Sequence, residues 1–146
     1  MSKFRISKTA VDVDALKKEM ADPRSGGFVS FEGWVRNRNE GKDVTHLEYQ
    51  SYEALAVKEG DKVIAEALQR YDVIDALVEH RVGDLQIGEV AVVVHVTSIH
   101  RGPAFEACEY IIDELKVRVP VWKKEHYADG DSGWIECHEC SKHNHN

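Results

Sequence analysis

The segment from Val90 to Ser98 narrows the choice of fold further than any other part of the chain. It is rich in valine and contains no Asp, Glu, Lys or Arg, which is typical of a central strand covered on both faces. The next segment, Pro103–Arg118, has apolar residues at helical spacing and a proline suited to the first turn of a helix. A buried strand followed by an amphipathic helix predicts a sheet with helices packed against it.

The remaining segments extend this pattern. Alternating residues in Phe28–Arg36 and Val44–Tyr52 predict two strands around a turn at Asn39–Gly41, which we expect to pair as a hairpin. The other predicted elements are strands at Phe4–Ile6, Ile74–Val82, Val119–Glu125 and Trp134–Cys137, a short helix capped by Asp12 or Asp14, and a helix at Glu53–Tyr71 in which Gly60 is expected to permit close packing. The order β-α-β-β-α-β-β-α-β predicts an α+β fold with a mainly antiparallel sheet, packed helices and a small β subdomain, similar to an α/β-hammerhead.

Composition indicates one globular unit. The chain has 146 residues, 42% of them hydrophobic and 31% charged, and we expect a single domain at 1–136 with a flexible tail at 137–146. No apolar run is long enough to span a bilayer, and Met1–Ser7 does not resemble a signal peptide. The three cysteines have no disulfide-framework spacing, so we expect a cytoplasmic protein.

Charge is distributed unevenly along the chain. The net charge of −7 disfavours nonspecific binding to nucleic acid or to anionic lipid. Four cations and no acid fall between Lys116 and Lys124, and Arg36 and Arg38 form a second cluster. Basic clusters on an acidic protein favour a local site for a small anion, although a solvated lysine-rich face would give the same pattern.

His100 and Arg101 stand between the buried strand and the helix that begins near Pro103. The free N–H groups and the dipole of a helix N-terminus attract anions, and an arginine can hold phosphate oxygens in a bidentate manner. This junction is therefore a candidate anion site. The alternative is that both residues cap the sheet edge and pair with a nearby acid.

Lys116 lies just beyond the apolar stripe of the same helix, next to Ile112, so its stem is expected to pack and its amine to reach a rim. Partial burial lowers the pKa of a lysine and makes it a base or a nucleophile, whereas many such lysines only extend to water. After Pro120, the segment Trp122–Lys124 is expected to bring two more amines, those of Lys123 and Lys124, back toward this neighbourhood. Trp122 is suited either to stacking on a flat ring or to core packing.

The cysteines offer two weaker candidates. Cys137 and Cys140 form a C-x2-C pair with histidines nearby, which is a zinc-binding arrangement, but no second pair follows at the spacing of a structural zinc finger. We interpret this segment as a mobile tail with incidental affinity for metal. Cys108 lies on the apolar stripe of its helix, which favours inert packing over nucleophilic chemistry.

Several short segments follow one another in a fixed order. They are FEGWVRNRNEG at 31–41, LEYQSYE at 47–53, HRVGDL at 80–85, GE at 88–89, SIHR at 98–101, AF at 104–105, IDELK at 112–116 and PVWKKE at 120–125. In this order they resemble the large, catalytic subunit of molybdopterin synthase, over about residues 28–136. Each segment alone is unspecific, but the ordered combination is specific to this family.

The resemblance implies a sulfurtransferase that converts cyclic pyranopterin monophosphate into molybdopterin by installing the two sulfurs of the dithiolene, without a metal or another cofactor. Sulfur would arrive as a thiocarboxylate on the C-terminal Gly-Gly of a small ubiquitin-like partner. Two large subunits would form a dimer with one small subunit on each outer side, a heterotetramer. Position by position, the resemblance makes Lys116 and Lys123 catalytic and assigns substrate binding to Arg36, His100, Arg101, Lys124 and Glu125.

Two other functions fit parts of the sequence. One is a binding module for an anion or a nucleotide with no chemistry of its own. The other is a metal-handling protein that uses the Cys- and His-containing tail, a segment that departs from what we expect of the family. No nucleic-acid or membrane partner is expected.

Overall fold

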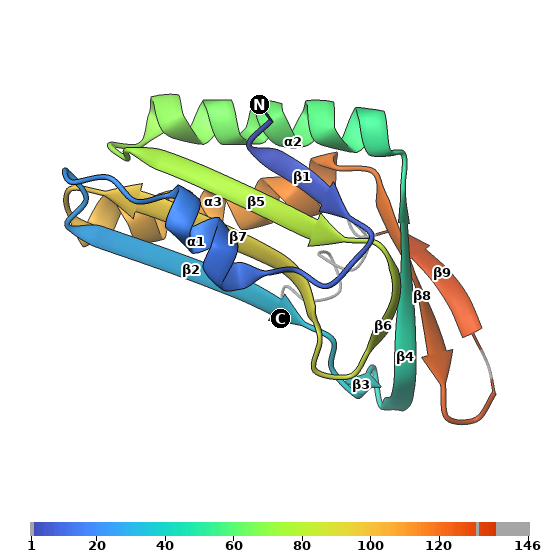
Figure 1. Cartoon of the computed structure of the whole chain (residues 1–146). Coiled ribbons are helices and arrows are strands. Elements are labelled where there is room, and N and C mark those ends of the chain that lie inside the picture. Colours follow the sequence, from blue (N-terminus) through green and yellow to red (C-terminus); the bar gives the residue numbers. More distant parts are fainter. Residues whose placement is uncertain (1, 131, 137–146) are drawn as a thin grey trace.

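The computed structural model describes residues 2–130 and 132–136, so the predicted tail lies outside the described residues. These residues form two sheets and three helices, and Figure 1 shows their α+β arrangement. The first sheet has the order β1-β5-β7-β2, formed by Phe4–Ser7, Asp75–Arg81, Val90–Ser98 and Gly27–Trp34. The β1–β5 pair is parallel, and the other strand pairs of the described residues are antiparallel, as predicted.

The valine-rich strand β7 lies between β5 and β2, and its residues from Val93 to Ser98 are all buried. The helices α2 (Glu53–Arg70) and α3 (Arg101–Arg118) pack on one face of this sheet and form the main core with it. The short helix α1 (Val13–Glu19) covers the other face through Leu16 and Met20. Its N-cap is Asp12, whose carboxylate accepts a hydrogen bond from the Ala15 amide at 3.0 Å. The prediction of a central, doubly covered strand is confirmed.

The second sheet forms the predicted small β subdomain. It has the order β3-β4-β8-β9, formed by Arg38–Asn39, Lys42–Ser51, Val121–Tyr127 and Ser132–Glu136. Strand β6 (Gly83–Gln86) was not predicted from the sequence. It follows β5 and precedes β7 along the chain, but it pairs with β4 and so belongs to the second sheet. A second core lies under this sheet and contains Val35, Leu47 and Leu85.

The predicted hairpin between Phe28–Arg36 and Val44–Tyr52 is wrong. Strand β2 pairs with β7 over its full length, and β4 pairs with β6 and β8 in the other sheet. The chain leaves the first sheet after Trp34, because Val35 enters the second core and its amide donates to the Glu89 carbonyl at 3.0 Å. A two-residue strand, Arg38–Asn39, makes the expected turn to β4, with positive φ at Glu40 and Gly41.

Gly60 lets helix α2 approach strand β1, as the sequence predicted. A Cβ atom at this position would lie 2.2 Å from Cγ of Phe4, whose ring is almost fully buried. Gly60 is therefore required by packing rather than by backbone conformation, because it lies in the middle of a regular helix.

Candidate functional site: a cationic pocket between the sheets

A cavity of about 360 Å³ opens where the two sheets meet the C-terminal part of α3. Its lining is largely apolar and aromatic, and includes Phe4, Phe31, Trp34, Tyr49, Ile112 and Leu115. Trp34 is 66% exposed and Phe31 is 37% exposed. Exposed rings beside a cavity of this size suit a flat small molecule.

Three cationic side chains line this pocket: Arg36 just after β2, Lys116 in the last turn of α3, and Lys123 on β8. No Asp or Glu is among the described residues that line it. The three positive charges are therefore not neutralised by an acidic lining residue, and the apolar walls strengthen their field. The pocket is suited to an anionic ligand.

A chain of polar contacts holds Arg36 in place. Its guanidinium donates to the Asn39 side-chain oxygen at 3.3 Å, and the Asn39 amide donates to Oε1 of Glu125 at 2.6 Å. Glu125 is 2% exposed and also accepts from the Tyr127 hydroxyl at 3.4 Å. Glu125 is absent from the pocket lining, and the structure places it behind Arg36, to which it is linked through Asn39.

The pocket also contains His80, which the sequence did not single out as a site residue. Its Nδ1 donates to the Arg81 carbonyl at 2.7 Å, because a carbonyl can only accept, and Tyr49 packs edge-on against its ring. Burial lowers the pKa of His80 to about 4. His80 is neutral at pH 7, with its Nε2 lone pair free of a proton. The signal in the sequence that could have identified His80 as a site residue was its position in HRVGDL, one of the segments that carry the family resemblance.

We expect acid to destabilise the fold through His80. Its pKa is about 4 when folded and 6.5 in its ordinary state, so below pH 6.5 the unfolded chain binds a proton that the folded chain does not. The loss grows as the pH falls toward 4 and amounts to about 2 kcal/mol between pH 7 and pH 5. Urea unfolding at both pH values checks this. The loss should shrink in His80→Gln and persist in the exposed control His100→Gln; an equal loss in both variants would contradict it.

Lys124 does not line the pocket. Lys124 follows Lys123 directly on β8, and successive side chains of a strand point to opposite faces, so Lys124 lies on the other face of the second sheet. On that face its amine is 5.6 Å from the centre of the Trp134 ring. Trp122 lies on that same face and packs edge-on against Tyr52. The structure thus separates Lys124 from Arg36, Lys116 and Lys123.

His100 and Arg101 are exposed and lie at the N-terminal end of α3. Arg101 is fifteen positions before Lys116 on the same helix, a distance of about 22 Å along its axis. Neither residue lines the pocket. Within one chain, the structure therefore does not bring them to the cations at the other end of α3.

Cys108 is buried on the apolar face of α3, and burial raises its pKa to about 11. A thiol with a raised pKa carries little thiolate at neutral pH, so Cys108 is a poor nucleophile. This agrees with the prediction of inert packing. Cys137 and Cys140 lie outside the described residues.

The fold and the pocket define an α+β protein whose three cations surround an apolar cavity open to a small anion. The model of the MoaE protein family matches residues 6–118, and the chain belongs to this family. A Pyrococcus abyssi relative named molybdopterin synthase catalytic subunit is 47% identical over 112 residues, covering 77% of this chain and 75% of its own. The Bacillus subtilis protein of the same name is 40% identical over 135 residues, covering 92% and 85%.

A solved structure shows the same fold. The crystal structure of molybdopterin synthase from Staphylococcus aureus superposes with a TM-score of 0.87 at 32% identity, covering 92% of this chain and 98% of the other. The predicted family is confirmed, and membership gives the chain a role in molybdenum cofactor biosynthesis. None of the helices in the described part of the chain is long and apolar enough to cross a membrane.

Proposed function

We propose that this chain is the sulfur-transferring subunit that converts cyclic pyranopterin monophosphate into molybdopterin. The observation that carries the proposal is the pocket with Arg36, Lys116 and Lys123 around an apolar, aromatic cavity and no acidic lining residue among those described. A phosphorylated pterin is flat and anionic, so it matches both the cavity walls and the charge. The names of the relatives contain the word subunit, which agrees with an enzyme of more than one chain.

The partner in this proposal is a small ubiquitin-like protein whose C-terminal Gly-Gly ends in a thiocarboxylate. Its negatively charged tail would reach the same cations as the substrate. In each transfer sulfur replaces an oxygen on a carbon of the pterin side chain: one carbon–oxygen bond breaks as the cyclic phosphate opens to a monophosphate, and the other oxygen leaves as water. Water then cleaves the acyl carbon–sulfur bond that joins the partner to the pterin, which leaves the sulfur on the pterin and a carboxylate on the partner. Two such transfers produce the dithiolene. These steps require proton transfers, which a lysine amine beside the reacting atoms can supply.

The three cations have different positions and so different proposed roles. Arg36 is held by Asn39, which pre-organises its guanidinium to grip the substrate phosphate. Lys116 is exposed on the last turn of α3 and transfers protons at the reacting carbon. Lys123 is half-buried on β8 and guides the thiocarboxylate. Glu125 acts in this proposal as a positioning residue for Arg36 through Asn39.

We also propose that His100 and Arg101 serve the pocket of a second copy of this chain. Strand β2 is an edge strand, with His100 and Arg101 near its start and the pocket at its end. Arg101 lies close to Gly27, the first residue of β2, because a Cβ atom added to Gly27 would be 3.3 Å from Cα of Arg101. Antiparallel pairing of two β2 edges would place the start of each strand beside the end of the other. Phe28, Phe31 and Trp34 expose apolar surface along this edge.

Mixed dimers test this arrangement. We expect Lys116→Ala and Arg101→Ala each to be inactive alone. When equal amounts are unfolded and refolded together, about half of the dimers contain one chain of each kind, and one of the two sites in such a dimer is intact. The mixture should therefore regain roughly a quarter of wild-type activity. The measurement is product formation against the ratio of the two chains. If both residues served the same chain's pocket, no mixture would be active.

Reconstitution tests the function itself. The purified chain is mixed with a thiocarboxylated small partner and cyclic pyranopterin monophosphate, and a dithiolene-bearing pterin is assayed. Product is expected only when all three components are present. A matched reaction with an ordinary carboxylate partner should give none. Tight binding of the pterin phosphate, independent of the partner and without product, would instead support an anion-binding module.

A further inference from the structure

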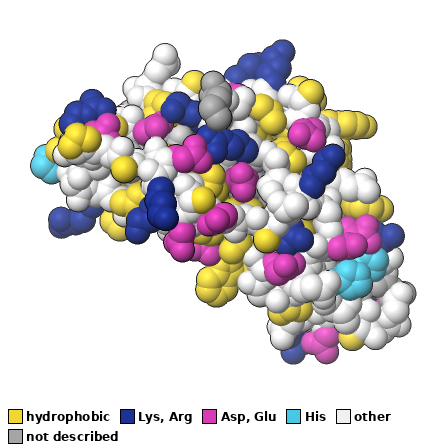
Figure 2. All heavy atoms as spheres, viewed as in Figure 1, with side chains coloured by type: hydrophobic (Ala, Val, Ile, Leu, Met, Phe, Trp, Pro, Cys, Tyr) yellow, Lys and Arg dark blue, Asp and Glu magenta, His cyan; other side chains and the backbone are white. Residues whose placement is uncertain are grey.

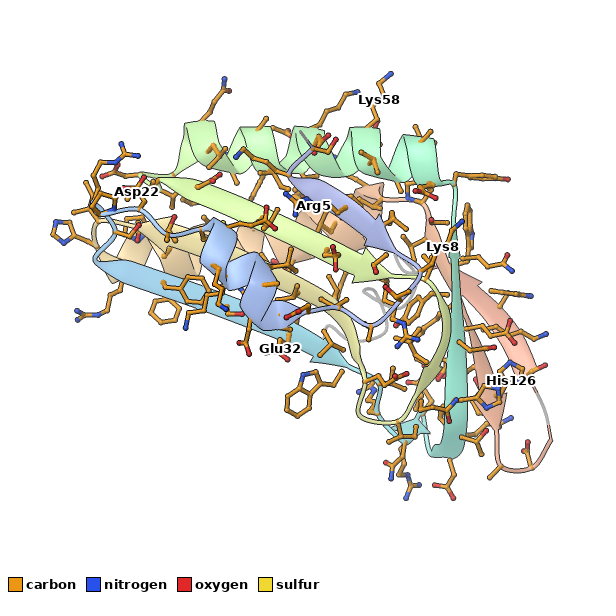
Figure 3. The ribbon with its side chains drawn as sticks, viewed as in Figure 1. Arg5, Lys8, Asp22, Glu32, Lys58 and His126 are labelled. Atoms are coloured by element: carbon orange, nitrogen blue, oxygen red, sulfur yellow. The ribbon has the colours of Figure 1, made fainter. Side chains whose placement is uncertain are left out.

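The outer face of the second sheet carries a cluster of metal-ligating side chains that the pocket does not use. His46 and Glu48 lie two positions apart on β4, and His126 lies directly opposite His46 on β8. Each offers one ligand atom, and these atoms all lie within 4.8 Å of one another. Figure 3 shows His126 on the exposed side of β8, and Figure 2 shows histidine and acidic side chains adjoining there. The cluster is half-buried and separate from the pocket.

We propose that His46, Glu48 and His126 form a binding site for one divalent transition-metal ion of the zinc class. Two imidazole nitrogens and one carboxylate oxygen are a known ligand set for zinc, with a fourth position open to water. The same set disfavours calcium and magnesium, which take oxygen ligands only. The ion would join β4 to β8.

A β-bulge prepares His46 for this role. On β4, Val44 pairs with Tyr127 and His46 pairs with His126, which are adjacent residues of β8. Thr45 is therefore the extra residue of the bulge. The Thr45 hydroxyl donates to the His126 carbonyl at 3.1 Å, so its oxygen accepts from Nδ1 of His46 at 3.2 Å. This leaves the lone pair of His46 on Nε2, so Nε2 is the nitrogen that we expect to bind the metal. Such an outer hydrogen bond fixes the orientation of metal-ligating histidines.

His126 and Glu48 already meet. Nε2 of His126 lies 2.9 Å from Oε1 of Glu48, and a metal ion would take the place of the proton between these atoms. The rings of His46 and His126 are stacked, with centroids 4.0 Å apart and planes 10° apart. Two nitrogens bound to one tetrahedral zinc ion lie about 3.3 Å apart, so binding rotates the rings out of this parallel stack.

The surrounding charges are mixed. The residues paired with Glu48 are Asp84 on β6 and Lys124 on β8, and paired residues share one face of a sheet. Gln86 and Ser132 pair with the two histidines and are uncharged. Asp84 favours a cation, whereas the amine of Lys124 lies over the Trp134 ring and disfavours one.

The experiment uses the full-length chain with the ligand-type tail residues replaced by serine, so that the tail cannot bind the probe. These are Cys137, His138, Cys140, His143 and His145. Zinc chloride is titrated by calorimetry, and Co²⁺ is followed by its visible absorption. We expect one equivalent of metal and, at a hundredfold excess over the dissociation constant, a melting temperature raised by roughly 6–10 °C.

Matched substitutions decide the outcome. His46→Ala, His126→Ala and the conservative Glu48→Gln should each weaken binding at least about tenfold, as should Thr45→Val through the orientation of His46. Gln50→Ala, two positions beyond Glu48 on the same strand, should bind normally. Equal binding in all variants, binding that disappears with the tail substitutions, or no saturable binding of Zn²⁺ and Co²⁺ would each overturn the site.

Discussion

The Lys116→Ala chain is expected to fold and to bind the small partner, yet to form the dithiolene product at least about a hundredfold more slowly. The reason is that Lys116 is the cation on the last turn of α3 at the pocket, and loss of a positioned proton donor or acceptor costs about 10²–10⁴ in rate. Single-turnover product formation in the reconstituted reaction measures the effect.

Two variants separate chemistry from charge. Lys116→Arg keeps a positive charge but cannot release a proton at neutral pH, so it should remain slow if Lys116 transfers protons and recover if it only binds an anion. Lys58→Ala is the matched control, because Lys58 is exposed on α2 and extends away from the body of the molecule (Figure 3). Near-normal turnover by Lys116→Ala would remove this lysine from the mechanism.

The second large effect is on stability, at the contact between β1 and α2. Phe4→Ala should lower the free energy of unfolding by about 3–5 kcal/mol, because the Phe4 ring is almost fully buried in the main core and also forms part of the pocket wall. Gly60→Ala should also destabilise, by about 1–3 kcal/mol, since its Cβ would overlap the Phe4 ring. Urea unfolding at pH 7 measures both losses.

The double variant distinguishes packing from helix propensity. Once Phe4 is alanine, Gly60→Ala no longer meets the ring and should stabilise the protein by up to about 1 kcal/mol, because alanine favours a helix more than glycine. The effect of one substitution therefore changes sign with the residue at position 4. If Gly60→Ala were destabilising to the same extent in both backgrounds, the ring contact would not be the reason for glycine.

Local patterns in the sequence predicted most elements because each depends on a repeat within one segment. The stripe of Ala104, Ala107 and Ile111 defined α3, and the valine run defined β7. Strand pairing was different: alternation shows that Phe28–Arg36 is extended but not which strand lies beside it. The hairpin prediction failed for this reason, and β6 was missed because it begins with Gly83 and Asp84, residue types that are typical of turns and depleted in strands.

The sequence by itself determined the α+β class, the family, and three of the residues that line the pocket, Arg36, Lys116 and Lys123, because short ordered motifs carry that information along the chain. Only the tertiary structure decided which cations meet. It turned Lys124 to the other face of β8, buried Glu125 behind Arg36, and left His100 and Arg101 a helix length from Lys116. It also placed His126 beside His46 and Glu48, since residues distant in sequence become neighbours through strand register, which no single segment encodes.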